Sequence, residues 1–555
     1  MRSGIARQPS RRDIIAAGAA SVVTLSGGLG VAAPAMLNGT VFHDRRGTGK
    51  RMPGDPGIAG VMVSNGRDVV LTDSEGRWRL PAAGGGDVFL IKPPHWSTAV
   101  GLGGVPCISA PHNFADGRGF ADGAGDAVVT ADRRTPTIDF ALTRAREDAR
   151  FEVVLMADTQ PANAAELGYL RDDIISSVVG TGAAFGINHG DVVFDDLSLY
   201  PRYLKLLGAS GMPWHHCPGN HDIDKAAASD QTSRDTWRRT FGPRHYAFQY
   251  AEATFIILDN VYYHGHNPEH PNSGGYHGLI GAEQLQFVRN VLAHVARDRL
   301  VVLSMHIPLT NYQNAAAAAD TTLDRHALLR LLSGRPHTVS FAGHMHLTEH
   351  HYLGADAGFA GGTPHHHHVL TAASGGWWSG AKDVRGIPAA DAEDGSPNGY
   401  HLLIVEGANY HTRFVPAAGK SGAQLRASIE RLVPCTPRAG PLSPADVEHC
   451  ELVANVFDGG PATRVRYSIA GVTREPRPMQ RVTSPDPHMV RVFADQRALQ
   501  KPWMRALSSS HIWRAPMPTA LRPGVYCALV QADDEYGRPL QCHLLFEVMA
   551  PDLGT

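Results

Sequence analysis

Between residues 151 and 416, short apolar runs alternate with amphipathic helix patterns, and this alternation constrains the fold more than any other feature of the sequence. Continuous apolar strands are typical of sheets that are covered by helices, as in layered α/β cores. Strands are expected at Val153–Ala157, Phe185–Asn188, Pro213–Cys217, Thr254–Leu258, Leu300–Met305 and Val339–Ala342. Helices are expected at Glu166–Val179, Leu199–Leu207, Glu283–Val295 and Leu323–Leu332.

The segments on both sides of this core have β character. Short β-branched runs with turns such as Asn65-Gly66 precede it, and strand patterns with Pro-rich turns follow it from about Leu432. We therefore expect an N-terminal β-sandwich domain at residues 36–148, an α/β domain at 149–418 and a C-terminal β-sandwich domain at 430–555.

Residues 1–35 resemble a twin-arginine signal peptide. Arg11 and Arg12 precede a weakly apolar run, and Ala33-Pro34-Ala35 supplies a cleavage site. The alternative is an N-terminal membrane anchor. A signal predicts a periplasmic or secreted protein that uses the twin-arginine export machinery. Because no later run of about 20 apolar residues exists, we expect no stable membrane insertion after signal removal.

Charge and histidine content narrow the classes of partner. The chain has 51 Lys and Arg against 53 Asp and Glu, a net charge of −2. This balance argues against a protein that binds nucleic acid polymers or a membrane surface through broad positive charge. The 30 histidines favour metal binding instead, since histidine is the commonest metal ligand.

Five polar motifs each follow an expected strand, and the carboxyl ends of strands are where open α/β sheets bind ligands. The motifs are Asp158-Thr159-Gln160, Gly190-Asp191, Gly219-Asn220-His221-Asp222, Met305-His306 and Gly343-His344-Met345-His346. This series resembles that of the calcineurin-like metallophosphoesterases, whose pattern is D-x-H, G-D, G-N-H-[DE], H and G-H-x-H. The three-part layout resembles a bacterial exported group of these enzymes with flanking β domains. The resemblance implies a two-sheet sandwich core with helices on both faces.

The resemblance also implies two metal ions and a set of ligands. Hydrolysis of a phosphate ester needs a nucleophile and charge neutralisation, which two ions can provide. The resemblance gives the bridging role to Asp191. It places one ion on Asp158, Gln160 and His346, and the other on Asn220, His306 and His344. The mixed nitrogen and oxygen donors suit manganese, iron or zinc.

Two further features concern catalysis. His221 is predicted to be the general acid, oriented and kept cationic by Asp222. Gln160 departs from the pattern, because the family usually has histidine there and a neutral amide oxygen is a weaker ligand for these metals. Some branches of the superfamily do carry glutamine at this position.

Trp377, Trp378 and Asp383 are candidate substrate-binding residues, because their polar, aromatic segment follows a strand near the motifs. The alternative for the tryptophans is packing.

The sequence thus predicts an exported, binuclear, metal-dependent phosphoric ester hydrolase that uses a metal-activated water. Its substrate would be a phosphate monoester or diester, and nucleotide and sugar-linked esters are candidates. The alternative is a wall- or glycan-binding protein whose phosphoesterase core is weakened through Gln160.

Overall fold

The computed structural model describes residues 36–82, 87–111, 129–130, 137–270, 273–420, 422–432, 441–519 and 521–549. The signal peptide expected at residues 1–35 lies outside these residues and stays a prediction. None of the helices in the described part of the chain is long and apolar enough to cross a membrane.

The first core sheet has the strand order β13-β12-β11-β22-β23. Strands β11, β12 and β13 run parallel to one another, and β22 continues the sheet antiparallel to β11. Three apolar runs of the sequence therefore become neighbours, and the segments after them reach the same sheet edge. The bounds are Arg150–Met156 for β11, Phe185–Asn188 for β12, Trp214–His216 for β13, Gly399–Glu406 for β22 and Asn409–Pro416 for β23.

The second core sheet has the order β14-β15-β18-β19-β21-β20. Its four inner strands are parallel, whereas β14 and β20 pair antiparallel at the edges. The bounds are Tyr246–Tyr250 for β14, Ala253–Ile257 for β15, Leu300–Ser304 for β18, Thr338–Ala342 for β19, His365–Val369 for β21 and Glu349–Leu353 for β20. A short hairpin, β16 (Val261–Tyr263) with β17 (Tyr276–Gly278), follows β15.

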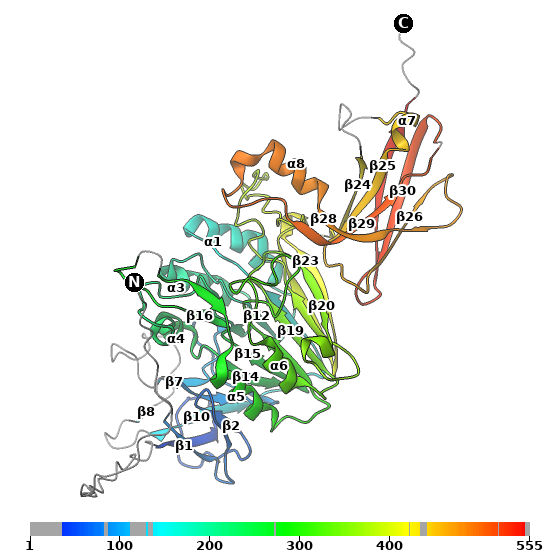
Figure 1. Ribbon diagram of the computed structural model, residues 1–555. Coiled ribbons are helices and arrows are strands. Elements are labelled where there is room, and N and C mark those ends of the chain that lie inside the picture. Colours follow the sequence, from blue (N-terminus) through cyan, green and yellow to red (C-terminus); the bar gives the residue numbers. More distant parts are fainter. Residues whose placement is uncertain are drawn as a thin grey trace, which may run out of the picture. The chain divides into compact units, whose positions relative to one another are not determined.

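The two sheets share one apolar core, which contains Leu155 and Ile187 of the first sheet and Leu303 and Phe341 of the second. Helices α5 and α6 pack into this core, while α1, α3 and α4 form a separate apolar cluster with Met156. Figure 1 shows α5 and α6 near β14 and β15. The helices are α1 (Ala164–Leu170), which continues through a π turn at Arg171–Ile175 into α2 (Ser176–Val178), α3 (Tyr200–Gly208), α4 (Asp235–Phe241), α5 (Gly281–Leu292) and α6 (Arg325–Leu332). The predicted fold class is confirmed.

The N-terminal β-rich region has two sheets, with the orders β6-β10-β1-β9-β8 and β3-β2-β5-β7, and β4 also pairs with β1. Val41, Trp78, Leu90 and Leu142 belong to the apolar cluster of this region. The strands are β1 (Met36–His43), β2 (Met62–Ser64), β3 (Val69–Leu71), β4 (Arg77–Pro81), β5 (Asp87–Ile91), β6 (Trp96–Ser97), β7 (Ser109–Pro111), β8 (Val129–Thr130), β9 (Thr137–Ile138) and β10 (Phe140–Arg144).

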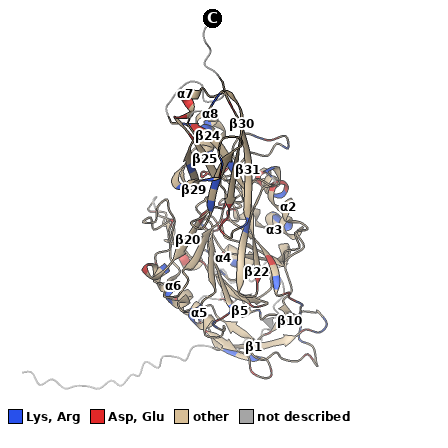
Figure 2. Cartoon of the chain, turned by 90° about the vertical axis from the view of Figure 1, so that its right-hand side faces the viewer, with Lys and Arg blue, Asp and Glu red and all other residues tan. Residues whose placement is uncertain are grey.

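The C-terminal β-rich region has two four-stranded sheets, β24-β25-β29-β28 and β27-β26-β30-β31, which share one apolar cluster. It also contains two helices that the strand patterns did not predict, α7 (Pro444–Val447) and α8 (Pro487–Asp495). The strands are β24 (Leu425–Arg431), β25 (Cys450–Val456), β26 (Arg464–Ile469), β27 (Arg477–Pro478), β28 (Gln480–Pro485), β29 (Ser508–Pro516), β30 (Gly524–Asp533) and β31 (Pro539–Val548). Figure 2 shows acidic and basic residues interspersed along the described chain, as the net charge of −2 leads one to expect.

Candidate metal centre

The predicted ligands meet because each follows a parallel strand. Asp158, Asp191 and Asn220 come after β11, β12 and β13, which are adjacent in the first sheet, and His306 and His344 come after β18 and β19, which are adjacent in the second. Carboxyl ends of parallel strands lie at one edge of a sheet. The two edges therefore bring five motifs together from across about 190 residues of sequence.

Asp191 lies at the middle of the resulting cluster. Its Oδ1 is 3.3 Å from His306 Nε2 and accepts a hydrogen bond from the His221 backbone N–H at 2.8 Å. Its Oδ2 accepts a hydrogen bond of 2.6 Å from Gln160 Nε2. Ligand atoms of Asp191, His306 and His344 all lie within 4.8 Å of one another. This central place suits a carboxylate that bridges two ions.

The remaining ligands surround this carboxylate. His306 Nε2 is 2.9 Å from Asn220 Oδ1 and 3.2 Å from His344 Nδ1. On the other side, His346 Nε2 is 3.7 Å from Asp158 Oδ1. Each of the seven predicted ligands thus has a short contact with at least one other, and their division between two ions stays a prediction.

The histidines present one ring nitrogen to the centre and pass the other to an acceptor. His306 Nδ1 faces the His189 carbonyl oxygen at 2.8 Å, and His346 Nδ1 faces that of Gly375 at 2.8 Å. His344 Nε2 lies 3.5 Å from a carboxylate oxygen of Asp320. Such acceptors hold the proton on the outer nitrogen and leave the inner lone pair available, as in protein metal sites. The donor set therefore fits metal ions.

Gln160 gives an independent sign of a ligand. Its carbonyl oxygen Oε1 is buried and has no hydrogen-bond partner among the described residues, although its amide nitrogen is bonded to Asp191. An unpaired buried carbonyl oxygen is costly. A cation beside it would satisfy the oxygen, so the amide at this position is compatible with metal binding.

The pKa values of Asp158 and His306 also favour a bound cation at this site. Burial raises the pKa of the Asp158 carboxyl to about 7, with the His306 charge opposing and the Asp191 charge adding to the shift. Burial works against charge on His306 too, but Asp191 raises the pKa of that ring to about 9. A bound cation stabilises the ionised form of such a carboxylate and displaces ring protons.

The backbone is strained at the ligands. Five of the seven ligand residues have φ between 35° and 72°, in the left-handed region that side-chain-bearing residues rarely adopt. Strain of this kind collects at functional sites, where the surrounding structure enforces it. The five are Asp158, Gln160, Asp191, His344 and His346.

Three motif glycines leave room for these side chains. Gly190 has φ of 93°, and a Cβ there would collide with the His306 ring. Gly219 and Gly343 have no such φ, but a Cβ on them would collide with Asp191 and Asp158. Sharp turning and close approach both explain Gly190, whereas close approach alone explains the other two.

His221 lies beside the centre, but its orienting carboxylate is not the predicted one. Its Nδ1 contacts Asp195 Oδ1 at 2.9 Å, and its Nε2 is 3.9 Å from Asp191 Oδ2. Asp222 is fully buried and faces away. It accepts hydrogen bonds from the backbone N–H groups of Gly219 and Val192 and from the Tyr200 hydroxyl. The role expected of Asp222 is thus corrected: Asp222 ties two ligand loops together and Asp195 orients His221.

The predicted substrate residues fall in different places. Trp377 stacks on His346, with ring centroids 4.0 Å apart. Trp378 is only 3% exposed, and its Nε1 donates to the Thr159 carbonyl oxygen. A ring that is buried on both faces cannot hold a substrate, so the prediction is wrong for Trp378. Asp383 accepts hydrogen bonds from the backbone N–H groups of Arg385 and Ile387, and no described contact joins it to the ligands.

Sequence patterns missed three residues around the centre. Asp195 stands four positions after Asp191, and its neighbour Asp196 caps the helical turn that follows. Phe194 stacks on His221 at 4.5 Å between ring centroids. Trp503 comes from the C-terminal region and packs on both Phe194 and Trp377. Nothing in the sequence near Trp503 signals this position, since it is more than 100 residues from the motifs.

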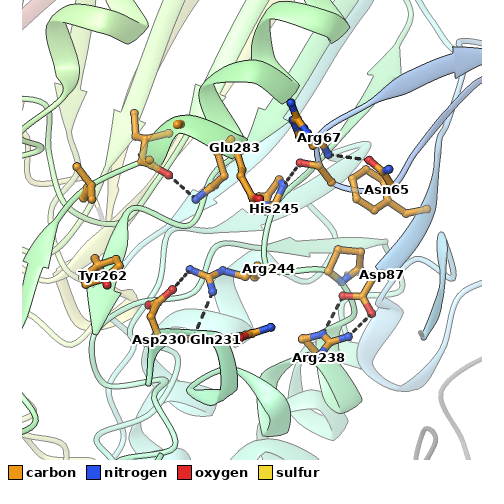
Figure 3. Close-up of a pocket in the computed structure, with 18 of the residues that line it drawn as sticks. Asn65, Arg67, Asp87, Asp230, Gln231, Arg238, Arg244, His245, Tyr262 and Glu283 are labelled. Carbon is orange, nitrogen blue, oxygen red and sulfur yellow. Dashed lines mark hydrogen bonds and ion pairs between the residues drawn. The ribbon is translucent and has the colours of Figure 1, made fainter. Parts of the chain in front are cut away.

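A cavity of about 600 Å³ lies apart from these residues (Figure 3). Its lining includes Arg238, paired with Asp87 at 3.0 Å, and Arg244, paired with Asp230 at 2.9 Å. None of the predicted ligands lines it. Because Arg238 and Arg244 are both paired with carboxylates, we assign the catalytic chemistry to the cluster of ligands at the strand ends and not to this cavity.

Comparisons with known proteins agree with this geometry. The family model described as calcineurin-like phosphoesterase matches residues 151–347, and the model of the C terminal of calcineurin-like phosphoesterase matches residues 367–539. No curated protein sequence matches the chain.

Two solved structures are similar to the chain. One is a purple acid phosphatase from yellow lupin (Lupinus luteus) seeds, with 14% identity and a TM-score of 0.36, covering 64% of this chain and 67% of that one. The other is PhoD, with 10% identity and a TM-score of 0.35, covering 94% of this chain and 95% of that one. On the two family models, which match in chain order, this chain belongs to the calcineurin-like phosphoesterases.

Proposed function

We propose that the chain is a binuclear metal-dependent phosphoesterase that hydrolyses phosphate monoesters or diesters. The match to this family implies divalent or iron-type metal ions. The observation that carries the proposal is the arrangement of His306, His344 and His346, each of which has its outer nitrogen on an acceptor and its inner nitrogen toward the cluster. Structural histidines have no need of such an arrangement on two separate loops, one after β18 and one after β19.

In this proposal each residue near the centre has one role, and the seven ligands are divided between the two ions. Asp158, Gln160 and His346 would hold one ion, and Asn220, His306 and His344 the other, with Asp191 between them. When bound, two such ions lower the pKa of water and neutralise charge on the phosphoryl oxygens. Asp222 keeps the loops of Asp191 and Asn220 together through its bonds to Val192 and Gly219.

His221 supplies the proton for the leaving oxygen in this proposal. Its Nδ1 is fixed by Asp195, which leaves Nε2 directed toward the centre. Phe194 covers one face of the ring and limits its rotation. An imidazole held in this way can donate a proton at Nε2 while Asp195 stabilises the ring orientation.

Export is the second part of the proposal. Arg11, Arg12 and the Ala33-Pro34-Ala35 site support delivery beyond the inner membrane by the twin-arginine route. Replacing both arginines by lysine should keep the protein in the cytoplasm of a bacterial host, as measured by fractionation. Unchanged export of that variant would contradict the assignment.

The hydrolytic activity is tested by removing and restoring metal. The full chain is stripped with a chelator, reloaded with manganese, iron or zinc, and assayed with an aryl phosphate monoester and a diester. Asp191→Asn should lose both ions of this centre and the activity, because it weakens the shared bridge, whereas Gln160→Ala should lose mainly one ion. Full metal retention by Asp191→Asn would contradict the ligand assignment. If reloaded protein hydrolysed neither ester, the binding alternative would be favoured.

A further inference from the structure

A second cluster of metal-binding side chains lies outside the phosphoesterase centre. His350 is on β20, His368 on β21, His401 on β22, and Asp458 follows β25 of the C-terminal region. The Nε2 atoms of the three histidines lie 3.2, 3.1 and 3.2 Å from the same oxygen, Asp458 Oδ1. Ligand atoms of His350, His368 and Asp458 all lie within 4.8 Å of one another.

The cluster is buried. The side chains of His350, His368 and His401 are 0% exposed, and that of Asp458 is 12% exposed. A carboxylate oxygen has two lone pairs, so three imidazole donors exceed what it can accept with good geometry. Hydrogen bonding alone therefore gives an incomplete account of why three rings converge on one oxygen.

The three distances to Asp458 Oδ1 match three edges of a tetrahedral metal site. Zinc lies about 2.0–2.1 Å from histidine nitrogen and carboxylate oxygen, so the edges of a regular tetrahedron of ligands are about 3.3 Å long. The three distances to Asp458 Oδ1 are close to that length. An N₃O donor set suits zinc and other imidazole-binding transition metals, and not calcium or magnesium.

His350 also has an outer partner. Its Nδ1 lies 2.9 Å from His366 Nε2, and His366 Nδ1 lies 2.9 Å from the Tyr410 hydroxyl. This relay fixes the orientation of the His350 ring, as acceptors behind metal-binding histidines do. The hydrogen bonds of the four cluster residues involve none of the ligands of the first centre.

We propose that His350, His368, His401 and Asp458 bind one structural transition-metal ion of the zinc class. Four protein ligands complete a tetrahedron and leave no position for substrate, which is typical of structural sites. The ion would join both core sheets to the C-terminal region, since His350 and His368 lie in the second sheet, His401 lies in the first and Asp458 follows β25. This second site does not depend on the hydrolytic activity proposed above.

Metal content of the full chain tests the proposal. After stripping and reloading with zinc, the Asp191→Asn protein should still hold an ion, and Asp458→Asn should hold one ion fewer than the unmodified chain. His365→Gln is the matched control. His365 is equally buried on β21 but points to Thr338 and Ser340, so this change should leave the metal content as it is.

If Asp458→Asn folds poorly, the visible spectrum of bound cobalt and the melting temperature of Asp191→Asn test the proposal instead. Cobalt-loaded Asp191→Asn should show the intense visible bands of four-coordinate cobalt, and a chelator should remove those bands and lower its melting temperature. The proposal would be overturned if the Asp191→Asn protein contained no metal after reloading. It would also be overturned if folded Asp458→Asn held as much metal as the unmodified chain. In that case Asp458 would be a hydrogen-bond acceptor only.

Discussion

At the scale of single residues, His221 is held between two carboxylates with different surroundings. Asp195 contacts its Nδ1 and is 45% exposed, while the buried Asp191 lies 3.9 Å from its Nε2. Burial disfavours a charged ring, but Asp191 and then Asp195 raise the pKa of His221 above its ordinary value. The ring thus has a fixed orientation, and the two carboxylates favour its protonated form.

This arrangement predicts a dependence on the leaving group. A positioned general acid contributes about 10²–10⁴ in rate, so His221→Asn should lower kcat by that order for an alkyl phosphate ester. Asp195→Asn should cause a smaller loss, because the ring remains but loses its orientation. Both losses should shrink for nitrophenyl esters, whose leaving group needs little protonation. Steady-state kinetics on the two ester types measure the difference.

Asp222→Asn serves as the comparison. Because Asp222 bonds loop backbone and not the His221 ring, its loss should lower stability and affect both ester types equally. If Asp195→Asn behaved in the same way as Asp222→Asn, the orienting role of Asp195 would be refuted.

At this scale, local geometry decides which contacts can be predicted from the sequence. Ligands such as Asp158 and His306 were predictable because a strand end fixes where the next side chain lies. The partner of His221 was not, because Asp222 directly follows it in a turn and points the opposite way, whereas Asp195 comes from another loop. Adjacency in sequence is a poor guide to contact within a turn.

At the scale of elements, the strand-to-loop junctions determine where the ligands lie. β12 has the predicted bounds, Phe185–Asn188, because a buried strand with turn residues after it can be recognised from composition. Helix α8 lies in a region whose sequence pattern predicts strands. Its N-cap residue Asp486 and its first residue Pro487 are residue types that are also common in turns. Tertiary packing through Met489 decides in favour of the helix.

A pair of glycines tests the crowding at one junction. Gly219→Ala should destabilise the protein by about 1–3 kcal/mol and reduce metal content, because a Cβ there has no space beside Asp191. Gly168→Ala in α1 is the control. A Cβ at Gly168 meets nothing within 4 Å, so this change should stabilise by about 0.5–1 kcal/mol through helix propensity. Denaturant unfolding and metal analysis of both variants check this, and equal behaviour would contradict it.

At the scale of the whole molecule, the C-terminal region contacts the loops that lead to the metal centre. The buried Glu393 accepts a hydrogen bond from the Arg505 backbone N–H, and Asp394 pairs with the buried His511. The described contacts therefore predict that stability depends on both parts together. Sequence patterns could separate the regions by composition but gave no sign of these contacts.

Glu393 should make stability depend on pH. Burial raises the pKa of its carboxyl from about 4.5 to about 7, against the backbone N–H and charge of Arg505. Below pH 4.5 the Glu393 carboxyl is protonated in both the folded and the unfolded chain. Between pH 4.5 and 7 the carboxyl ionises in the unfolded chain but stays protonated in the folded one, so the free energy of unfolding falls as pH rises. The loss is at most about 3 kcal/mol. Glu393→Gln should remove it, giving a larger gain in unfolding free energy at pH 8 than at pH 5. Glu406→Gln, which replaces an exposed carboxyl, is the control variant.

We expect Trp503 to bring the C-terminal region into substrate recognition. It is 52% exposed, lies parallel to Phe194 at 6.1 Å and meets Trp377 edge-on at 5.9 Å. Stacking on an aromatic platform contributes about 1–3 kcal/mol per ring, equivalent to about 5- to 150-fold in affinity. Trp503→Ala should therefore raise KM by that order for nucleotide or other ring-bearing esters, with little change for a small alkyl ester and in melting temperature. Trp378→Ala, a core truncation, should instead lower the melting temperature and impair all substrates alike. An equal effect of Trp503→Ala on both ester classes would mean that the ring only packs against Phe194.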